Sequence, residues 1–178
     1  SACVECAKKE VIRMKDLSNK VAIITGSSSG VGAATARLFA SLGCHVVVNY
    51  NANSAGAEQV AKECEELGVE TVCFGGSVAN DTDCVAMVKA AMDKWGRVDI
   101  LVNNAGTTKF VDHNNLDGLD AEDFQRIYGV NVIGCYQMTR AARAAMEAND
   151  EGGAVVNIAS TAAVTGIGSS IAYAASKG

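Results

Sequence analysis

Near its N-terminus the chain reads Val21-Ala-Ile-Ile-Thr-Gly-Ser-Ser-Ser-Gly-Val-Gly32. The first residues form a short apolar run, which is typical of a strand buried on both faces of a parallel sheet. A cluster of glycine and serine follows at once, and an alanine-rich segment with helical spacing comes after it. A strand, a glycine-rich turn and a helix in this order predict the first unit of a nucleotide-binding α/β fold.

The glycines of this turn have distinct expected roles. Gly26 permits a sharp turn, Gly30 leaves the backbone open to a phosphate, and Gly32 lets the helix pack close to its strand. Unpaired N–H groups and the dipole at the helix N-terminus favour an anion there. No Gly-Lys-Ser/Thr is present, as ATP hydrolysis by a P-loop would require. By itself the motif favours nucleotide binding, with a plain turn as the alternative.

The rest of the chain continues the alternation of strand and helix. Apolar runs predict strands at residues 21–25, 45–50, 71–74, 98–102 and 154–159. Helical spacing predicts helices at residues 30–42, 54–67, 81–95 and 121–149, and another from about residue 170. In the first helix the spacing rests on Val31, Ala34, Leu38 and Leu42, and the long one should loosen at Gly129 and Gly134. Strands that alternate with helices predict a doubly wound α/β fold with a parallel sheet.

Composition limits the class of protein. A chain of 178 residues suits one domain with a substantial core. The net charge of −5 argues against a nucleic-acid partner, no apolar run approaches the length of a membrane span, and the N-terminus is too polar for a secretory signal. We therefore expect a cytoplasmic protein. The seven cysteines are predicted to be reduced and mostly buried, and the lone C-x-x-C pair, Cys3 and Cys6, lacks the partners of a metal site.

Polar clusters follow several of the predicted strands. They lie at Thr25–Gly32, Asn103–Gly106 and Ser160–Thr161. In a doubly wound sheet the ligand binds at the carboxyl ends of the strands, so these clusters should meet at one edge.

Together these segments resemble the short-chain dehydrogenase/reductase family, in its compact branch. The resemblance rests on T-G-x-x-x-G-x-G at Thr25–Gly32, Asn-Asn-Ala-Gly at Asn103–Gly106, Ser160, and Tyr173-Ala-Ala-Ser-Lys177. It implies a Rossmann-type dinucleotide-binding and catalytic domain over residues 14–178 that lacks the C-terminal strands and helices of the family. Residues 1–13 match nothing in it and are interpreted as an extension with no assigned role.

The resemblance implies a proton-relay tetrad for interconverting a secondary alcohol and a ketone. Tyr173 would be the general acid/base, Lys177 its activator, Ser160 the partner of the substrate oxygen, and Asn131 the fourth member. Elementary chemistry agrees, because residues i and i+4 of a helix share one face and a nearby ammonium favours the phenolate form of a tyrosine. Taken singly, each of these residues has an ordinary structural interpretation, so the joint pattern carries the prediction.

The resemblance also implies the residues that contact a nicotinamide cofactor. They are Gly26, Ser28, Ser29, Gly30, Val31, Gly32, Asn49, Tyr50, Asn51, Ser77, Val78, Asn104, Ala105, Gly106, Tyr173 and Lys177. No carboxylate follows the second strand to bond the ribose hydroxyl of NAD, and Asn51, Asn53 and Ser54 offer donors there. We expect NADP in preference to NAD, although no arginine is present in that loop. Ser77 stands where the family commonly has an aspartate that contacts adenine.

Other features remain open at this stage. The chain ends at Gly178, one residue after Lys177, so we expect a fragment of a longer reading frame. The alternatives to an active oxidoreductase are an inactive truncated fragment and a non-catalytic dinucleotide-binding sensor on the same fold. The expected partners are a small-molecule carbonyl or alcohol and, in a full-length protein, further copies of the chain in a dimer or tetramer.

Overall fold

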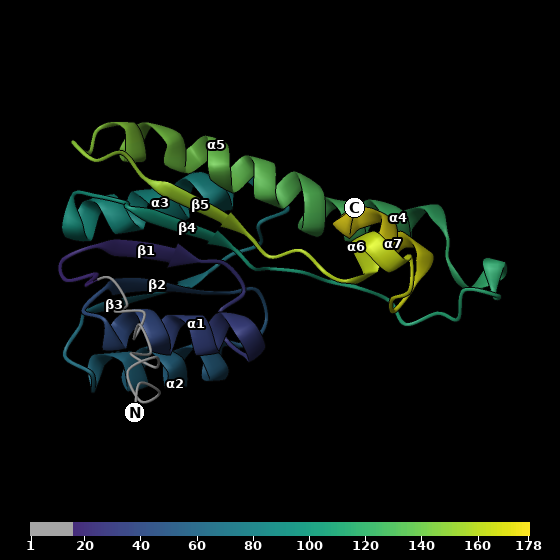
Figure 1. Ribbon diagram of the computed structural model, residues 1–178, viewed down its shortest axis with the longest axis horizontal. Coiled ribbons are helices and arrows are strands. Elements are labelled where there is room, and N and C mark those ends of the chain that lie inside the picture. Colours follow the sequence, from purple (N-terminus) through teal and green to yellow (C-terminus); the bar gives the residue numbers. More distant parts are fainter. Residues whose placement is uncertain (1–15) are drawn as a thin grey trace, which may run out of the picture.

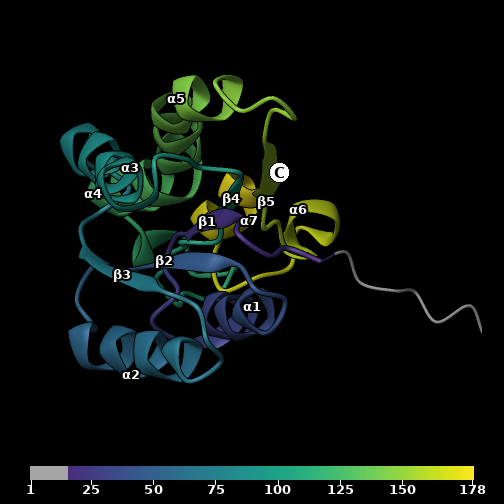
Figure 2. The ribbon, with the colours of Figure 1, turned by 90° about the vertical axis from the view of Figure 1, so that its left-hand side faces the viewer.

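The computed structural model describes residues 16–178 as a parallel sheet with helices on both faces (Figures 1 and 2). The predicted N-terminal extension and the pair Cys3 and Cys6 lie outside the described residues. The five strands are β1 (Val21–Ile24), β2 (His45–Tyr50), β3 (Thr71–Gly75), β4 (Ile100–Asn103) and β5 (Ala154–Asn157). Their order across the sheet is β3-β2-β1-β4-β5, and every pairing is parallel. The predicted doubly wound α/β class is confirmed.

The helices follow the predicted alternation with the strands. They are α1 (Gly30–Ser41), α2 (Ser54–Glu65), α3 (Asp81–Trp95), α4 (Ala121–Tyr128), α5 (Gly134–Glu147), α6 (Ala162–Thr165) and α7 (Ile171–Lys177), with a 3-10 turn at Leu116–Gly118. Helices α1 and α2 cover one face of the sheet, and α3 and α5 cover the other (Figure 2). Helices α4, α6 and α7 gather beyond the carboxyl ends of β4 and β5 (Figure 1).

The central strand supplies both hydrophobic cores. All four residues of β1 are fully buried. Ile23 pairs with Val47 on one side and Leu101 on the other, and packs into the core below α3 and α5, whereas Ile24 packs into the core below α1 and α2. Each buried isoleucine stabilises the fold by roughly 1.5–3 kcal/mol relative to exposure. This explains why β1 reads as a continuous apolar run rather than as an alternation.

Helix α1 forms as predicted, but it buries a different stripe. The side chains of Val31 and Leu38, on which the helical spacing was based, are 61% and 47% exposed. The buried stripe consists of the small residues Gly32, Ala33, Ala36 and Ala40. A small stripe lets the helix axis approach the sheet closely, and this close approach brings the N-terminus of α1 to the ligand edge. The spacing of larger apolar residues therefore indicated the helix and missed its buried face.

The long helix predicted at residues 121–149 is interrupted where its glycines lie. Helix α4 ends at Tyr128, a π-helical segment covers Gly129–Ile133, and α5 begins at Gly134. A Cβ at Gly134 would lie 2.6 Å from the Val78 side chain, so only glycine fits there. A π-helical segment re-aims the side chains within it. Here the re-aimed side chain is Asn131, which is 5% exposed.

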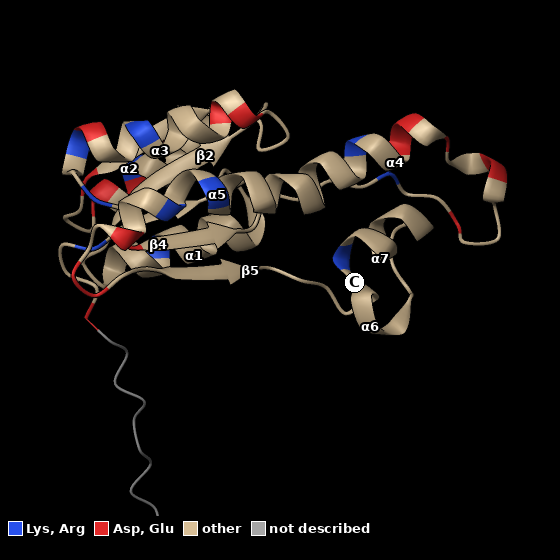
Figure 3. Ribbon diagram, turned by 90° about the horizontal axis from the view of Figure 1, so that it is seen from above, with Lys and Arg blue, Asp and Glu red and all other residues tan. Residues whose placement is uncertain are grey.

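Strand β5 forms an open edge of the sheet within the described residues. All four of its residues are exposed, including Val155 at 41% and Val156 at 45%. Figure 3 shows that neither β5 nor α6 carries a charged residue. An exposed, uncharged strand edge has unpaired backbone groups that can accept another strand. In the described part of the chain, no helix is long and apolar enough to span a bilayer.

Candidate active site

The glycine-rich turn has the backbone that a bound phosphate requires. Gly26 and Gly30 have φ of +62° and +56°, in the left-handed region that favours glycine. A Cβ at Gly26 would lie 2.8 Å from the Cα of Ala105, whereas one at Gly30 would have nothing within 4 Å. Ser29 precedes α1 and makes no side-chain cap, so it leaves the first N–H groups of the helix to another acceptor. The turn fits a pyrophosphate group.

The Asn-Asn-Ala-Gly motif packs directly against this turn. The side-chain nitrogen of Asn104 donates to the backbone oxygens of Thr25 at 2.9 Å and Gly26 at 3.1 Å. A Cβ at Gly32 would overlap with that nitrogen and would lie 2.8 Å from the Gly26 oxygen. The predicted need for glycine at position 32 is therefore real, and its cause is close packing against the Asn104 side chain and the turn.

Asn49 was predicted as a cofactor contact, but its side chain makes internal hydrogen bonds. Its Oδ1 accepts from the Gly26 N–H at 2.9 Å, and its Nδ2 donates to the carbonyls of Phe74 at 3.2 Å and Gly76 at 3.0 Å. The residue is 2% exposed. Asn49 thus joins the ends of β1, β2 and β3 and shapes the turn. Because this tie depends on contacts between strands, the local sequence gave no sign of it.

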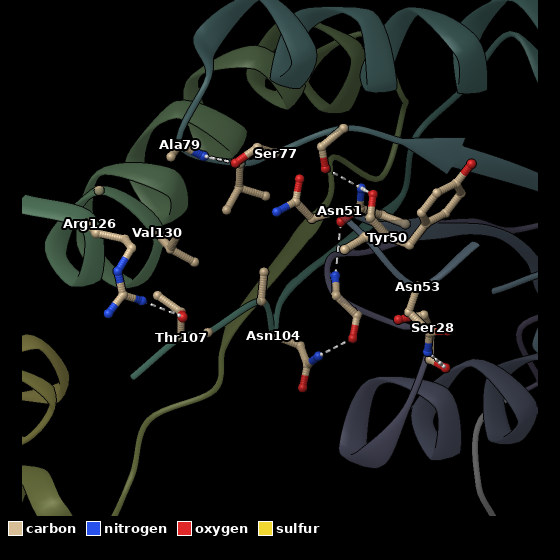
Figure 4. A pocket seen from close by; sticks show the side chains of 18 of the residues that line it. Ser28, Tyr50, Asn51, Asn53, Ser77, Ala79, Asn104, Thr107, Arg126 and Val130 are labelled. Carbon is tan, nitrogen blue, oxygen red and sulfur yellow. Dashed lines mark hydrogen bonds between the residues drawn. The ribbon is translucent and has the colours of Figure 1, made fainter. Parts of the chain in front are cut away.

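These elements enclose a cleft of about 590 Å³ at the carboxyl ends of the strands (Figure 4). Its lining contains most of the predicted cofactor residues, namely Gly26, Ser28, Ser29, Asn49, Tyr50, Asn51, Ser77, Val78, Asn104, Ala105 and Gly106. Gly30, Val31 and Gly32 lie at the start of α1 and are not part of this lining. Residues that the sequence did not indicate also line it, among them Thr107, Arg126 and Val130.

The loop after β3 is held by the first turn of α3. The Ser77 N–H donates to Asp83 Oδ2 at 2.9 Å, and the Ser77 hydroxyl accepts from the Ala79 N–H at 3.3 Å. The Val78 carbonyl accepts from Gln137 Nε2 at 2.8 Å, which ties the loop to α5. Ser77 is thus held in place at the cleft, at the position where the family commonly has an aspartate.

Asn131 and Lys177 are brought together beside Gly106. The Asn131 Oδ1 accepts from the Thr107 N–H at 2.8 Å, and its Nδ2 donates to the Ser176 hydroxyl at 2.8 Å. The Lys177 Nζ donates to the Ile158 carbonyl at 2.8 Å. A Cβ at Gly106 would lie 3.6 Å from Asn131 Oδ1 and 3.7 Å from Lys177 Nζ, so both polar groups border the same small space.

Tyr173 and Lys177 line a second cavity, of about 390 Å³, which adjoins the cleft. The two cavities share Asn104, Gly106 and Thr107 in their linings. Ser170 caps the N-terminus of helix α7; it is fully buried, and its side chain accepts from the Tyr173 N–H at 3.2 Å. A helix of seven residues is unstable alone, so this cap and the Asn131–Ser176 contact orient Tyr173 and Lys177.

Ser160 has a local role in the structure. Its hydroxyl accepts from the Ala162 N–H at 3.2 Å, at the turn that begins α6. Its neighbours Ile158 and Ala159 line the cavity beside Tyr173, but Ser160 is not among the lining residues. Of the predicted tetrad, Asn131, Tyr173 and Lys177 therefore lie close together. Ser160 follows Ala159, the last residue of this segment that lines the cavity, and does not itself line it.

Three of the five cysteines in the described part of the chain are buried thiols, and Cys73 is exposed. Burial raises the pKa of Cys44 to about 12 and those of Cys64 and Cys84 to about 11. Burial also raises the pKa of Cys135, although the nearby charge of Lys177 opposes this shift. Within residues 16–178, no group of histidine, cysteine and acidic side chains could hold a metal ion.

Comparison with known proteins agrees with this geometry. The family described as short chain dehydrogenase matches residues 20–178. The chain is 35% identical to a 3-oxoacyl-[acyl-carrier-protein] reductase from Synechocystis over 92% of this chain and 65% of that protein. A structure from Burkholderia xenovorans, described as a short-chain dehydrogenase/reductase, has 44% identity and a TM-score of 0.85 over 89% of this chain and 66% of that one.

A third similarity is to the crystal structure of an NAD⁺-bound xylitol dehydrogenase. The identity is 28% and the TM-score 0.83, over 92% of this chain and 61% of that one. The chain thus spans less than two thirds of the length of each of these relatives. A parallel sheet with a glycine-rich turn between its first strand and helix is the architecture of dinucleotide-binding folds. The chain belongs to the short-chain dehydrogenase/reductase family of oxidoreductases.

Proposed function

We propose that this chain carries the cofactor and proton-transfer sites of an oxidoreductase that interconverts a secondary alcohol and a ketone. One observation carries the proposal: the cavity beside Tyr173 and Lys177 shares three residues with the cleft above the phosphate turn. A dinucleotide held at that turn would have the cleft available for its adenosine half and the cavity beside Tyr173 for its nicotinamide half. The names of the relatives, a reductase and a dehydrogenase, support the same reaction class.

The residues that would hold the cofactor fall into distinct groups. The N-terminus of α1, with Ser28, Ser29 and Gly30–Gly32, suits the pyrophosphate. The adenosine half would contact the ends of β2, β3 and β4, which contribute Tyr50, Asn51, Ser77, Val78, Ala105 and Gly106 to the cleft. When bound, the nicotinamide supplies the hydride chemistry of the reaction.

The chain's own side chains carry out the proton transfer of the proposed reaction. Tyr173 protonates the substrate oxygen in reduction and takes the proton back in oxidation. Lys177, at position i+4 on the same helix, favours the phenolate form through its charge. Ser160 steadies the substrate oxygen with its hydroxyl proton, which the hydrogen bond accepted from the Ala162 N–H leaves free. Asn131 positions α7 through Ser176 and completes the tetrad.

NADP is the preferred cofactor in this proposal, with NAD as the alternative. Among the described residues that line the cleft none is a carboxylate, so a ribose 2′-phosphate would meet no repulsion there. Asn53 Nδ2 reaches toward the Ser28 carbonyl at 3.5 Å, and Asn51 is exposed, so both amides border the place for that phosphate. Titrating the chain with NADPH and with NADH tests this preference directly.

The substrate is proposed to be a small carbonyl or alcohol compound, and the working assembly a dimer or tetramer. Exposed apolar side chains on α5 and β5, such as Tyr136 at 63% and Val156 at 45%, support contact with further protein. Measurement of the mass of the particle in solution tests the assembly.

The decisive test of function combines binding with turnover. The chain is titrated with NADPH and NADH, and the oxidation of the tighter binder is then followed with a panel of ketones. Cofactor oxidation that depends on a ketone supports the proposal. Binding without oxidation by any ketone would favour a dinucleotide sensor or an inactive fragment, and no binding at all would contradict the dinucleotide site.

A further inference from the structure

Thr107 lies at the border between the cofactor cleft and the Tyr173 cavity, and it lines both. Asn131 holds its backbone in two places, because the Thr107 N–H donates to Asn131 Oδ1 at 2.8 Å and the Thr107 carbonyl accepts from Asn131 Nδ2 at 3.0 Å. With its backbone groups paired in this way, Thr107 has its hydroxyl left for a further contact. The partner of that hydroxyl therefore contributes to how firmly the segment after Gly106 is held.

Arg126 of α4 is the partner of this hydroxyl. Its Nη1 donates to the Thr107 hydroxyl at 3.2 Å and to the Thr108 carbonyl at 3.5 Å (Figure 4). The Arg126 side chain is 47% exposed. Long hydrogen bonds from an exposed side chain are weak by themselves. The guanidinium therefore needs a fixed partner of its own if it is to hold the segment in place.

Asp123 is that fixed partner. The residue is 9% exposed, and its carboxylate accepts from Arg126 Nη2 at 3.3 Å. The carboxylate also accepts from the ammonium of Lys109, which lies two residues after Thr107 in the same segment. A largely buried carboxylate is costly to separate from the cations that pair with it. Asp123 therefore holds residues 107–109 at two points, directly through Lys109 and indirectly through Arg126.

The far side of the same segment contacts the loop that leads into α7. The hydroxyls of Thr108 and Ser169 form a hydrogen bond at 2.5 Å, and the Val111 N–H donates to the Ser169 carbonyl at 2.8 Å. Ser169 directly precedes the cap of α7, the helix that carries Tyr173. Residues 107–111 thus connect α4 with the start of α7.

We propose that Asp123 is a positioning residue for the proposed reaction. Through Arg126 and Lys109 it holds residues 107–109 between the two cavities, so that a cofactor bound in the cleft and the Tyr173 hydroxyl meet the same substrate. Reaction rates depend steeply on such alignment, and a displacement of about 1 Å can cost up to about 10²-fold. The phosphate turn is held separately, by hydrogen bonds from the ends of β2 and β4, so cofactor affinity should depend little on Asp123. This inference rests on the proposed oxidoreductase function.

A helix-capping role for Asp123 is the alternative, and suitable variants separate the two roles. Asp123 and Asp120 form a capping box at the start of α4, in which each side chain accepts from the backbone N–H of the other. Asp123→Asn keeps an amide oxygen for the Asp120 N–H but lacks the charge that holds the two cations. Asp120→Ala removes the N-cap acceptor and leaves the Asp123 carboxylate in place. Arg126→Met interrupts the path to Thr107 without changing the capping box.

The test measures turnover, binding and hydrogen exchange on the same samples of the whole chain. In Asp123→Asn and in Arg126→Met, ketone-dependent oxidation of NADPH should have a kcat about tenfold lower, with KM for the ketone and Kd for NADPH within about twofold of the wild type. The double variant should be no slower than the slower single variant, because both substitutions break one path. The amides of residues 107–111 should exchange faster in all three. Asp120→Ala should have a lower Tm but the wild-type kcat and the wild-type exchange of this segment.

The other outcomes separate this inference from the proposed function. A wild-type kcat in both single variants, losses that multiply in the double variant, or an equal loss in Asp120→Ala would each overturn the positioning role. Unchanged exchange of residues 107–111 in both single variants would overturn it as well, with or without turnover. A wild type that binds NADPH but oxidises it with no ketone would instead overturn the proposed function. Should Asp123→Asn fail to fold, Arg126→Met decides alone, because it leaves the carboxylate and the capping box in place.

Discussion

The side-chain oxygen of Thr25 accepts a hydrogen bond from the backbone N–H of Asn104 at 3.0 Å. It also accepts from the Ala105 N–H at 3.0 Å and donates to the Val102 carbonyl at 3.3 Å. Thr25 and Asn104 are 79 positions apart in the sequence. One threonine hydroxyl therefore fixes the end of β4 against the phosphate turn, next to Asn104, which lines both the cofactor cleft and the Tyr173 cavity.

Removing this hydroxyl should destabilise the whole fold. Thr25 is 2% exposed, and Thr25→Val leaves the Ala105 N–H without its acceptor and the Asn104 N–H with the Val102 carbonyl alone. We expect the free energy of unfolding to fall by about 2–3 kcal/mol, measured by urea denaturation. Thr35→Val is the matched control, because the Thr35 hydroxyl donates only to Val31 in its own helix and should matter little. Equal effects of the two substitutions would contradict the role of the Thr25 hydroxyl in joining the end of β4 to the phosphate turn.

Loss of Asn131 should release helix α7 from the body of the site. Asn131→Ala removes the partner of the Thr107 N–H and of the Ser176 hydroxyl. The backbone amides of residues 173–177 should then exchange with deuterium much faster than in the wild type, which mass spectrometry can measure. Gln59→Ala, on the exposed face of α2, should leave that exchange unchanged. Protection of α7 that survives in Asn131→Ala would show that other contacts hold the helix.

Acid should weaken the fold through Asp99, at the opposite end of the sheet. Burial raises the pKa of Asp99, but hydrogen bonds from Arg97 and the Val21 N–H, with the charges of Arg97 and Lys20, outweigh it and hold the pKa below its ordinary value of 3.8. A lowered pKa in the folded state means that the stabilisation is complete above the unfolded value and is lost as the pH falls through the folded value.

Asp99→Asn tests this dependence on pH. It should lower the free energy of unfolding by about 2 kcal/mol near neutral pH, because hydrogen bonds to a charged group are lost. The difference from the wild type should shrink as the pH falls below 3.8. Asp93→Asn, whose ion pair with Lys89 is exposed, should show little effect at any pH. A difference between wild type and Asp99→Asn that grows on acidification would contradict the assignment.

The cysteines should differ in reactivity according to burial. Cys44, Cys64 and Cys84 are buried and have raised pKa values, so few of these thiols ionise in the folded state. Cys73 is exposed on β3. A short pulse of iodoacetamide at about pH 8 should label Cys73 before Cys44, Cys64 and Cys84, which should react only after unfolding in guanidinium, as read by peptide mass spectrometry. Early labelling of Cys84 in the folded chain would contradict the packing.

The order of strands and helices could be predicted from the sequence because each element has a local cause. β1 is a continuous apolar run, the turn after it is rich in glycine, and the long helix breaks where Gly129 and Gly134 lie. The buried face of α1 could not be predicted in this way. Its buried stripe consists of Gly32 and alanines. These small residues let the helix pack close to the sheet, and their own hydrophobicity is weak.

The candidate site could likewise be predicted where its residues have a local cause, and not where they depend on long-range contacts. Motifs adjacent to strand ends, such as Asn104 and Gly106, lie in the cleft as expected. Asn49 turned out to tie three strands together, and Arg126 entered the lining from α4 through its bond to Asp123. Both depend on contacts between segments far apart in the sequence, which spacing along the chain does not reveal.

The proposal depends most on Tyr173, which would move the proton in the cavity that adjoins the cofactor cleft and shares Asn104, Gly106 and Thr107 with it. The most direct measurement compares ketone-dependent oxidation of NADPH by the wild type and Tyr173→Phe, with NADPH affinity determined on the same samples. We predict that Tyr173→Phe lowers kcat/KM by about 10²–10⁴-fold and leaves NADPH affinity nearly unchanged. Turnover by Tyr173→Phe at the wild-type rate would contradict the account.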